Sequence, residues 1–323
     1  MTEQALRLGT RRSKLAMAQS GLVADAVGEV TGRPVELVEI TTYGDTSREH
    51  LAQIGGTGVF VDALREALLR GEVDFAVHSL KDLPTTQPDG LTLAAVPRRE
   101  DPRDVLIARD GLAFAELPEG ARVGTGSPRR MAQLNAYARD HGTRIETVPI
   151  RGNIDTRIGY VRKGELDAVV LAAAGINRIG RTSEVTDFLS VDTVLPAPGQ
   201  GALAVECRTA GNAADAALAA ALAELDDPFT RAAVTAERAL LAALEAGCSA
   251  PVGALADLLD DGQIDKEMRL RGVVGTTDGS TLVQLSTTGP VPETHDQAMA
   301  LGRELASEML AKGAAGLMGE RAQ

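Results

Sequence analysis

The sequence predicts an α/β protein with two lobes of similar design and a smaller C-terminal α+β domain, and three observations support this prediction. Short apolar runs alternate with helical patterns over the first 200 residues, which is typical of α/β domains whose sheets are mostly parallel. Two segments within this region resemble each other. After residue 226, a long helical pattern is followed by three strand patterns and a closing helix.

The strands predicted in the first 200 residues are short runs with apolar residues, and they alternate with helical patterns. The strands expected are Leu6–Gly9, Val35–Thr41, Phe75–His78, Leu91–Val96, Val105–Ala108, Arg122–Gly124, Arg144–Pro149 and Ala168–Ala172. The helices expected are Lys14–Thr31, Val59–Arg70, Pro128–Arg139 and Ile154–Lys163.

The two similar segments are Leu8–Ala16 and Val123–Ala132. In each, a strand ends in a Gly-Thr turn, and a serine, Ser13 or Ser127, stands where it can cap the helix that follows. The repeat predicts two lobes, each with a helix N-terminus at the ends of its strands.

Basic residues accompany both turns, Arg11 and Arg12 in the first and Arg129 and Arg130 in the second. A helix N-terminus offers unpaired N–H groups and the positive end of the helix dipole, so these turns are suited to bind carboxylates or phosphates. The alternative is ordinary helix capping with solvated arginines. Neither turn has the glycine spacing of a Walker loop or a dinucleotide-binding fingerprint, which disfavours nucleotide binding.

The C-terminal part begins after a cluster of turn residues at Pro196–Gly201 and an apolar strand expected at Ala202–Cys207. Asp227 is placed to cap a helix over Phe229–Ala246, with Pro228 at its first position. The elements expected beyond it are strands at Val252–Ala256, Arg269–Val274 and Thr281–Thr287 and a helix at His295–Lys312.

The net charge of −12 argues against DNA and other polyanions as partners, and most of this charge comes from residues 201–323. With no Trp, three Tyr and five Phe, the chain is also poorly equipped to stack on single-stranded nucleic acid. A small anionic ligand is compatible with the composition if arginines of the first 200 residues converge.

The sequence has no apolar run long enough to span a bilayer and no secretory signal at its start, which predicts a cytoplasmic protein without a membrane partner. The cysteines Cys207 and Cys248 do not form a disulfide framework, although one disulfide between them is an alternative. No Cys/His cluster has the spacing of metal ligands, so no metal is expected.

A strand that reads as buried delivers Ser79, Lys81 and Asp82 to a loop at its C-terminal end, where open α/β sheets bind their ligands. Asp82, beside the positive charge of Lys81, is a candidate general acid or base. The alternative is an exposed turn with a weak ion pair. His78 is expected to pack at the strand end rather than take part in chemistry.

Two further candidates for anion binding follow predicted strands. Arg151 stands at a glycine turn, and Asn153 can cap a helix that bears Arg157 one turn in. Arg178 follows another strand in the same way. The alternative for each is a solvated surface arginine.

Cys248 follows a glycine at the end of the long helix and is expected in a loop, whereas Cys207 reads as a core residue of an apolar strand. A helix C-terminus does not favour a thiolate, so Cys248 is not expected to act as a protease-type nucleophile. A stable thioether to a very electrophilic partner needs less activation. A buried, inert thiol is the alternative.

Taken together, these residues resemble the porphobilinogen deaminase family, also called hydroxymethylbilane synthases. The motifs that carry the resemblance occur in the family's order and span nearly the whole chain. They are Leu8–Ser13, Val77–Pro84, Arg99–Asp104, Gly124–Arg130, Arg151–Asn153, Leu195–Glu206 and Gly247-Cys248.

The resemblance implies two doubly wound lobes like those of periplasmic binding proteins, around a cleft, and a third domain that presents the cysteine. The boundaries expected are 1–97 with 200–222 for the first lobe, 98–199 for the second and 223–323 for the C-terminal domain. The implied protein is a cytoplasmic monomer whose partner is the small molecule porphobilinogen.

The implied reaction is a head-to-tail condensation of four porphobilinogen molecules to the linear tetrapyrrole hydroxymethylbilane, with release of ammonia. It starts on a dipyrromethane cofactor attached to the cysteine that matches Cys248. Loss of ammonia leaves a cationic azafulvene, and Asp82 matches the catalytic carboxylate that stabilises this charge.

By the same resemblance, arginines grip the acetate and propionate groups of the pyrroles. The cofactor-binding residues implied are Cys248, Lys81, Asp82, Thr125, Ser127, Arg129, Arg130 and Arg157. The substrate-binding residues implied are Arg11, Ser13, Arg151, Arg157 and Arg178.

The chain departs from the family pattern in few places. The stretch Thr46–Gly58 matches a loop near the cleft, but Gln53 and Thr57 stand where many bacterial members carry lysine, which puts cationic contact from this loop in doubt. Pro128, which often corresponds to leucine, is harmless in a first helical turn.

Two rival functions are a non-catalytic two-lobed anion receptor and a Schiff-base enzyme that uses Lys81.

Overall fold

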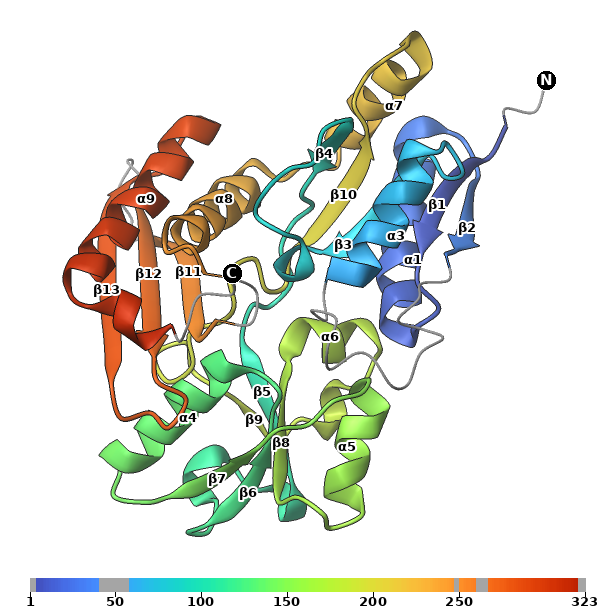
Figure 1. The fold of residues 1–323 in the computed structure, drawn as a ribbon. Helices are drawn as coiled ribbons and strands as arrows, with labels where there is room; N and C mark the ends of the chain where they lie inside the picture. The colour runs from blue at the N-terminus through green and yellow to red at the C-terminus, as the bar shows by residue number, and fades with distance from the viewer. Residues whose placement is uncertain (1–3, 41–57, 247–249, 260–266, 319–323) are drawn as a thin grey trace. The chain divides into compact units, whose positions relative to one another are not determined.

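A computed structural model of the chain describes residues 4–40, 58–246, 250–259 and 267–318. The chain forms two compact units (Figure 1). The first comprises Met1–Glu100 with Ala202–Arg231, and the second comprises Asp101–Gly201 with Ala232–Gln323. The second unit holds both the second lobe and the C-terminal domain, so the three-domain boundaries expected from the sequence stay a prediction.

The first lobe is a five-stranded sheet in the order β2-β1-β3-β10-β4. Its strands are β1 (Leu6–Thr10), β2 (Val35–Glu39), β3 (Phe75–Ser79), β4 (Leu91–Ala95) and β10 (Leu203–Arg208). Its helices are α1 (Lys14–Thr31), α3 (Gly58–Leu69), α7 (Ala213–Ala223) and the short 3-10 helix η1 (Leu80–Asp82).

The second lobe is a five-stranded sheet in the order β7-β6-β8-β5-β9. Its strands are β5 (Asp104–Ala108), β6 (Ala121–Gly124), β7 (Ile145–Val148), β8 (Ala168–Ala172) and β9 (Asp187–Phe188). Its helices are α4 (Pro128–Asp140), α5 (Ile154–Arg162) and α6 (Ala173–Arg178), with 3-10 turns η2 (Arg109–Gly111), η3 (Phe114–Glu116) and η4 (Thr182–Glu184).

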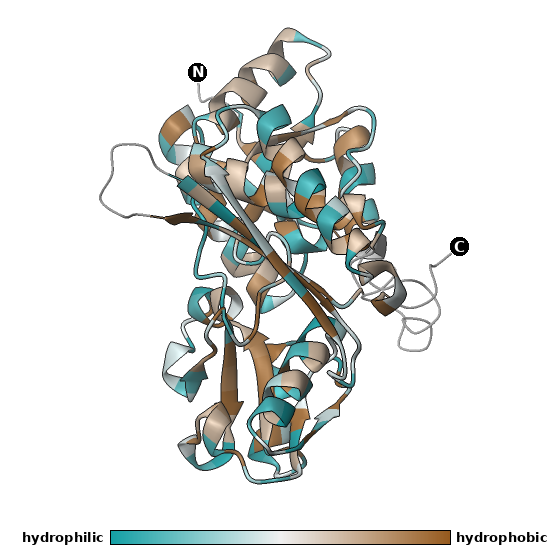
Figure 2. Ribbon diagram, turned by 90° about the vertical axis from the view of Figure 1, so that its left-hand side faces the viewer, coloured by the Kyte–Doolittle hydropathy of each residue, from teal (hydrophilic) through white to brown (hydrophobic). Residues whose placement is uncertain are grey.

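Both faces of the second sheet are covered, which explains why its strands are apolar throughout. Val170 of β8 packs on one side in a core that includes Leu134 of α4. Val169 of β8 packs on the other side in a core that includes Ile158 of α5. Figure 2 shows these strands as hydrophobic along their length, as expected for a sheet between two helical layers.

The two lobes share one plan. In each, three strands run parallel, the next runs antiparallel to them, and a fifth pairs antiparallel with that one. The prediction of two lobes of similar design is therefore confirmed. The expectation of mostly parallel sheets is also confirmed, because four strands of each sheet run in one direction and only β10 or β5 runs against them.

Each of these antiparallel strands buries a carboxylate. Glu206 of β10 has no exposed surface and accepts hydrogen bonds from Arg65 at 3.0 and 2.8 Å. His78 Nε2 lies 3.3 Å from Glu206 Oε2. Burial raises the pKa of Glu206, but His78 and Arg65 outweigh burial and lower it to about 2. His78 thus packs inside the lobe, as the sequence predicts, and Asp104 of β5 is the buried carboxylate of the second lobe.

The C-terminal part of the chain is an antiparallel sheet in the order β11-β12-β13 with two long helices, which confirms the predicted α+β arrangement. Gly302 lets the two helices approach closely, because a Cβ there would lie 2.3 Å from the carbonyl oxygen of Ala236. The elements are α8 (Pro228–Ala243), β11 (Val252–Leu259), β12 (Glu267–Gly275), β13 (Leu282–Pro290), α9 (His295–Ala311) and the 3-10 helix η5 (Ala314–Leu317).

Candidate active site

In the first lobe, the candidate residues lie at the carboxyl ends of two neighbouring parallel strands. β1 pairs with β3 through Leu8 and Phe75, so the turns that follow these strands lie at the same edge of the sheet. Arg11 and Ser13 follow β1, and Lys81 and Asp82 form η1 directly after β3. The structure therefore brings these four residues to one edge of the first lobe.

Local hydrogen bonds fix both turns. Ser13 Oγ accepts from the backbone N–H of Ala16 at 3.2 Å, which confirms the predicted helix cap. The N–H of Leu80 donates to the carbonyl of Ala202 at 3.0 Å and holds η1 against the chain that enters β10. Lys81 and Asp82 are both half-buried.

In the second lobe, the candidate residues follow three neighbouring parallel strands. β6 pairs with both β7 and β8, so the carboxyl ends of all three meet at one edge. Thr125 and Ser127 follow β6, Arg151 follows β7, and α6 with Arg178 follows β8. This edge is the counterpart of the one that carries Asp82 in the first lobe.

Two turns at this edge pack directly on each other. Gly126 has no room for a side chain, because a Cβ there would lie 2.6 Å from the carbonyl oxygen of Ile150. The N–H of Thr125 donates to the carbonyl of Val148 at 2.9 Å, and its Oγ1 accepts from the N–H of Ser127 at 3.2 Å. The Gly-Thr turn and the turn that carries Arg151 therefore form one rigid rim.

The guanidinium groups of Arg129 and Arg130 are buried, and both contact Asp104. Arg129 Nη1 donates to Asp104 Oδ2 at 2.8 Å and to the carbonyl of Leu195 at 2.6 Å. Arg130 Nη2 donates to Asp104 Oδ1 at 2.6 Å, and its Nη1 donates to the carbonyl of Val170 at 3.0 Å. Much of the hydrogen-bonding capacity of this pair is used within the protein, whereas the sequence alone predicts that both arginines hold a ligand.

The carboxylate of Asp104 stays ionised although it is fully buried. Burial raises its pKa, but the charges and hydrogen bonds of Arg129 and Arg130 outweigh burial and hold the pKa well below its usual range. Gln200 Nε2 adds a hydrogen bond of 2.8 Å to Asp104 Oδ1. The pKa of Arg157 is lowered by burial and then by the charge of Arg130, so these two cations act on each other.

This cluster has a surplus of positive charge. Arg129 and Arg130 share one carboxylate, Asp104, and Arg157 is repelled by the charge of Arg130. The Nε atoms of Arg129 and Arg130 are buried, and within the described part of the chain they have no hydrogen-bond partner. A ligand with several carboxylates fits such a cluster, because it supplies the missing negative charge.

Two further arginines of this edge donate to backbone carbonyls. Arg157 Nε donates to the carbonyl of Gly152 at 2.8 Å, in the turn where Asn153 caps α5 as predicted. Arg178 Nη2 donates to the carbonyl of Gly201 at 2.7 Å. Arg151 is exposed.

A network of ion pairs connects α5 to the segment after α6. Arg181 contacts Asp155 in the first turn of α5 at 2.5 Å and Glu184 at 2.5 Å. Glu184 also contacts Arg162 in the last turn of α5 at 2.8 Å. This network joins α5, which carries Arg157, to the segment that directly follows α6 and Arg178.

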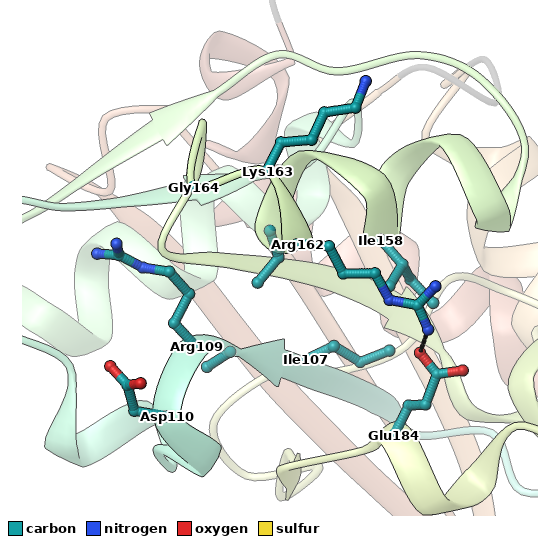
Figure 3. A pocket seen from close by; sticks show the side chains of 10 residues that line it. Ile107, Arg109, Asp110, Ile158, Arg162, Lys163, Gly164 and Glu184 are labelled. Carbon is teal, nitrogen blue, oxygen red and sulfur yellow. Dashed lines mark hydrogen bonds and ion pairs between the residues drawn. The ribbon is translucent and has the colours of Figure 1, made fainter.

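The pocket of about 570 Å³ in Figure 3 is not this site. It is lined in part by Ala108, which pairs with Ala168 at the beginning of β8 and so lies at the opposite edge of the sheet. Its Arg162 is paired with Glu184, and its Arg109 with Asp167. These two arginines are thus used in structural contacts.

Sequence reasoning missed Asp104, Gln200 and Arg181 as parts of the site. A detectable signal existed for Asp104, because an acidic residue that opens a fully apolar strand must have cationic partners. Neither Gln200 nor Arg181 differs in sequence from an ordinary loop residue. The predicted cofactor anchor Cys248 and the loop residues Gln53 and Thr57 lie outside the described residues.

Replacing Asp104 with asparagine is expected to destabilise the second unit by about 3–5 kcal/mol, because two buried guanidinium groups lose their counter-charge. The measurement is the shift of the urea unfolding midpoint. Asp101→Asn is the control. It breaks a partly exposed pair with Arg103 and should cost under about 1 kcal/mol. Equal midpoints for the two variants would show that the buried cluster does not hold the lobe together.

Comparison with known proteins decides the family. The model described as porphobilinogen deaminase, dipyromethane cofactor binding domain, matches residues 6–216, and the model of the porphobilinogen deaminase C-terminal domain matches residues 231–311. The chain belongs to the porphobilinogen deaminase family. Porphobilinogen deaminase 1 of Streptomyces coelicolor is 84% identical over 100% of both chains. Porphobilinogen deaminase of Thermobifida fusca is 58% identical over 97% of this chain and 96% of its own.

The resemblance seen in the sequence is thereby confirmed. As a porphobilinogen deaminase the chain is a transferase that joins four porphobilinogen molecules head to tail into hydroxymethylbilane with release of ammonia. Its cofactor is dipyrromethane. A non-catalytic anion-binding protein is not favoured.

Two solved structures with similar folds are periplasmic proteins or lipoproteins. A putative methionine-binding lipoprotein of Bacillus subtilis is 12% identical, with a TM-score of 0.40 over 69% of this chain and 91% of that chain. A periplasmic binding protein of Salmonella typhimurium with high arginine specificity is 16% identical, with a TM-score of 0.35 over 69% of this chain and 93% of that chain.

Within the described residues, no helix of the porphobilinogen deaminase chain is both long and apolar enough to cross a membrane.

Proposed function

We propose that the chain performs this condensation with Asp82 as the catalytic carboxylate and with the dipyrromethane attached to Cys248 through a thioether. The surplus positive charge around Arg129, Arg130 and Arg157 is the observation that carries the proposal, because each pyrrole unit brings an acetate and a propionate. Every added unit increases the negative charge that the protein must bind.

The cofactor, when bound, supplies the pyrrole terminus to which substrate units are joined. Its carboxylates fit the second-lobe edge, where the half-buried Ser127 and Arg157 and the exposed Arg151 lie at the strand ends beside the buried pair Arg129 and Arg130. The residues assigned to holding it are Lys81, Asp82, Thr125, Ser127, Arg129, Arg130 and Arg157.

The incoming porphobilinogen and the growing chain are assigned to arginines that are half-buried or exposed. Arg151 is exposed, and Arg178 is half-buried, so both can reach a mobile ligand from the sheet edge. Arginine suits this task because its charge is permanent and its planar fork can bind a carboxylate with two hydrogen bonds. The set is Arg11, Ser13, Arg151, Arg157 and Arg178.

Asp82 is assigned the chemical step. Positive charge develops on the substrate as its amino group leaves, and a carboxylate aimed at the pyrrole N–H stabilises this charge and assists proton transfer. The position supports this role, because η1 follows β3 at the edge where ligands of open α/β sheets bind.

The cellular setting is also part of the proposal. We assign the protein to the cytoplasm as a monomer that acts on a small molecule. Its net charge of −12 disfavours nucleic acid as a partner, since a polyanion would be repelled. No membrane contact is assigned to it.

Arg157→Gln tests the substrate assignment. Loss of one charge-assisted, partly desolvated contact is expected to raise KM for porphobilinogen about 10- to 100-fold. Steady-state kinetics measure this effect. Arg122→Gln is a matched control, because Arg122 also donates to a carbonyl, that of Glu165, but lies near the start of β6 away from the site edge. An unchanged KM in Arg157→Gln removes this residue from the binding set.

A further inference from the structure

The turn that joins β12 to β13 is held rigid by its own side chains. Thr276 Oγ1 donates to Asp278 Oδ1 at 2.6 Å, and the N–H of Ser280 donates to the same oxygen at 2.9 Å. The N–H of Gly279 donates to the carbonyl of Thr276 at 2.8 Å. The turn thus presents its backbone carbonyls in a fixed arrangement.

These carbonyls are bound by side chains of α4 in the second lobe. Asn135 Nδ2 donates to the carbonyl of Thr277 at 2.8 Å. Arg139 Nη1 donates to the carbonyl of Gly279 at 2.8 Å, and its Nη2 donates to that of Asp278 at 2.9 Å. Figure 1 shows the β12–β13 turn beside α4, in agreement with these contacts.

Gly279 makes the contact possible. Its φ of +67° favours glycine, and a Cβ there would lie 2.3 Å from the backbone nitrogen of Ala136 and 2.9 Å from the carbonyl oxygen of Ala132. Both of those atoms belong to the helix backbone and cannot move aside. The turn therefore lies directly on α4, where only glycine fits.

A second contact joins the same two parts of the chain. The N–H of Ala254 in β11 donates to the carbonyl of Pro196 at 2.9 Å. Glu237 of α8 accepts from the N–H of Gly199 at 2.7 Å and from the N–H of Ala256 at 2.9 Å. Leu195, next to Pro196, is the residue whose carbonyl binds Arg129.

α4 therefore carries both the arginines assigned to the cofactor and the side chains that bind the C-terminal sheet. Its first turn carries Arg129 and Arg130, and its later turns carry Asn135 and Arg139, which bind the C-terminal sheet. We infer that the β12–β13 turn is a positioning element for the condensation. It fixes the C-terminal domain on the helix whose arginines hold the cofactor.

This inference rests on the proposed function, because it gives the contact a role only if the C-terminal domain anchors the cofactor through Cys248. The C-terminal sheet and the arginines of α4 then keep one spacing through all cycles. Asn135, Arg139 and Gly279 act through other residues, so they are positioning residues and touch no reacting atom.

Gly279→Ala is expected to lower kcat about 10- to 100-fold with KM for porphobilinogen changed less than about 2-fold, because a shift of roughly 1 Å in the anchor misaligns the reacting groups. Gly32→Ala is the matched control. Gly32 has the same φ of +67° but has nothing within 4 Å of its Cβ position, so it adds the same backbone strain without a clash. Its kcat should match that of the unmodified enzyme.

Arg139→Gln keeps the backbone intact and removes two hydrogen bonds, so it covers the case in which Gly279→Ala does not fold. It should lower kcat about 5-fold, and Arg139→Lys should restore part of the loss. If Gly279→Ala and Arg139→Gln both turn over as fast as Gly32→Ala, the inference is overturned, even if the unfolding temperatures of the two variants fall. A separate measurement tests the proposed function. A pyrrole adduct that persists in Cys248→Ala would show that Cys248 is not the anchor.

Discussion

Asp82→Asn should lose nearly all turnover and keep its fold. The substitution removes one negative charge at the carboxyl end of β3 and changes the shape of the side chain very little. A carboxylate that stabilises developing positive charge and assists proton transfer contributes about 10²- to 10⁴-fold to such rates. KM for porphobilinogen should change little, since arginines bind the carboxylates of the substrate. Single-turnover release of ammonia measures the chemical step directly.

A carboxylate in the same region provides the control for this experiment. Asp89 is exposed in the turn before β4, seven residues after Asp82, and Asp89→Asn should leave turnover unchanged. Thermal unfolding of both variants should match that of the unmodified enzyme. If Asp82→Asn turns over at the normal rate, the chemical step depends on another group.

The elements that the sequence predicts best are those with local signals at their ends. Ser13, Ser127 and Asn153 each cap the helix expected to follow them, and Asp227 accepts from the N–H of Thr230 at 2.7 Å at the beginning of α8. Such caps are encoded by residues three or four positions apart, so they can be read without knowledge of the fold.

α7 was missed although it is a complete helix. Eight of its eleven residues are alanine, which favours a helix but gives no amphipathic pattern to detect. The cap at Asn212, which accepts from the N–H groups of Ala214 and Asp215, was the available signal. β9, two residues long, gives too short a pattern to recognise.

The sheet order could not be predicted from local pattern. β10 pairs with β3 across more than 120 residues of chain, and a run of apolar residues does not specify which strand it joins or in which direction. The same limit applies to the candidate site. Asp104, which lies 25 residues from Arg129, determines how much of that arginine is left for a ligand, and this pairing depends on the fold.

The two cysteines of the chain differ in a way that makes the anchor testable. Cys207 is 1% exposed in β10, within the core of the first lobe, and burial raises its pKa to about 11. It is therefore an inert thiol. Cys248 is the remaining candidate for a thioether, and Cys207→Ala is a control that removes a thiol without touching the proposed anchor.

The central claim is that a dipyrromethane tethered to Cys248 is held by the arginines of the second lobe, and the intact mass of the purified protein tests it most directly. The unmodified enzyme and Cys207→Ala should both exceed their sequence masses by one dipyrromethane. Cys248→Ala should have its sequence mass alone and make no hydroxymethylbilane. An enzyme without this increment, or an increment that persists in Cys248→Ala, would contradict the account.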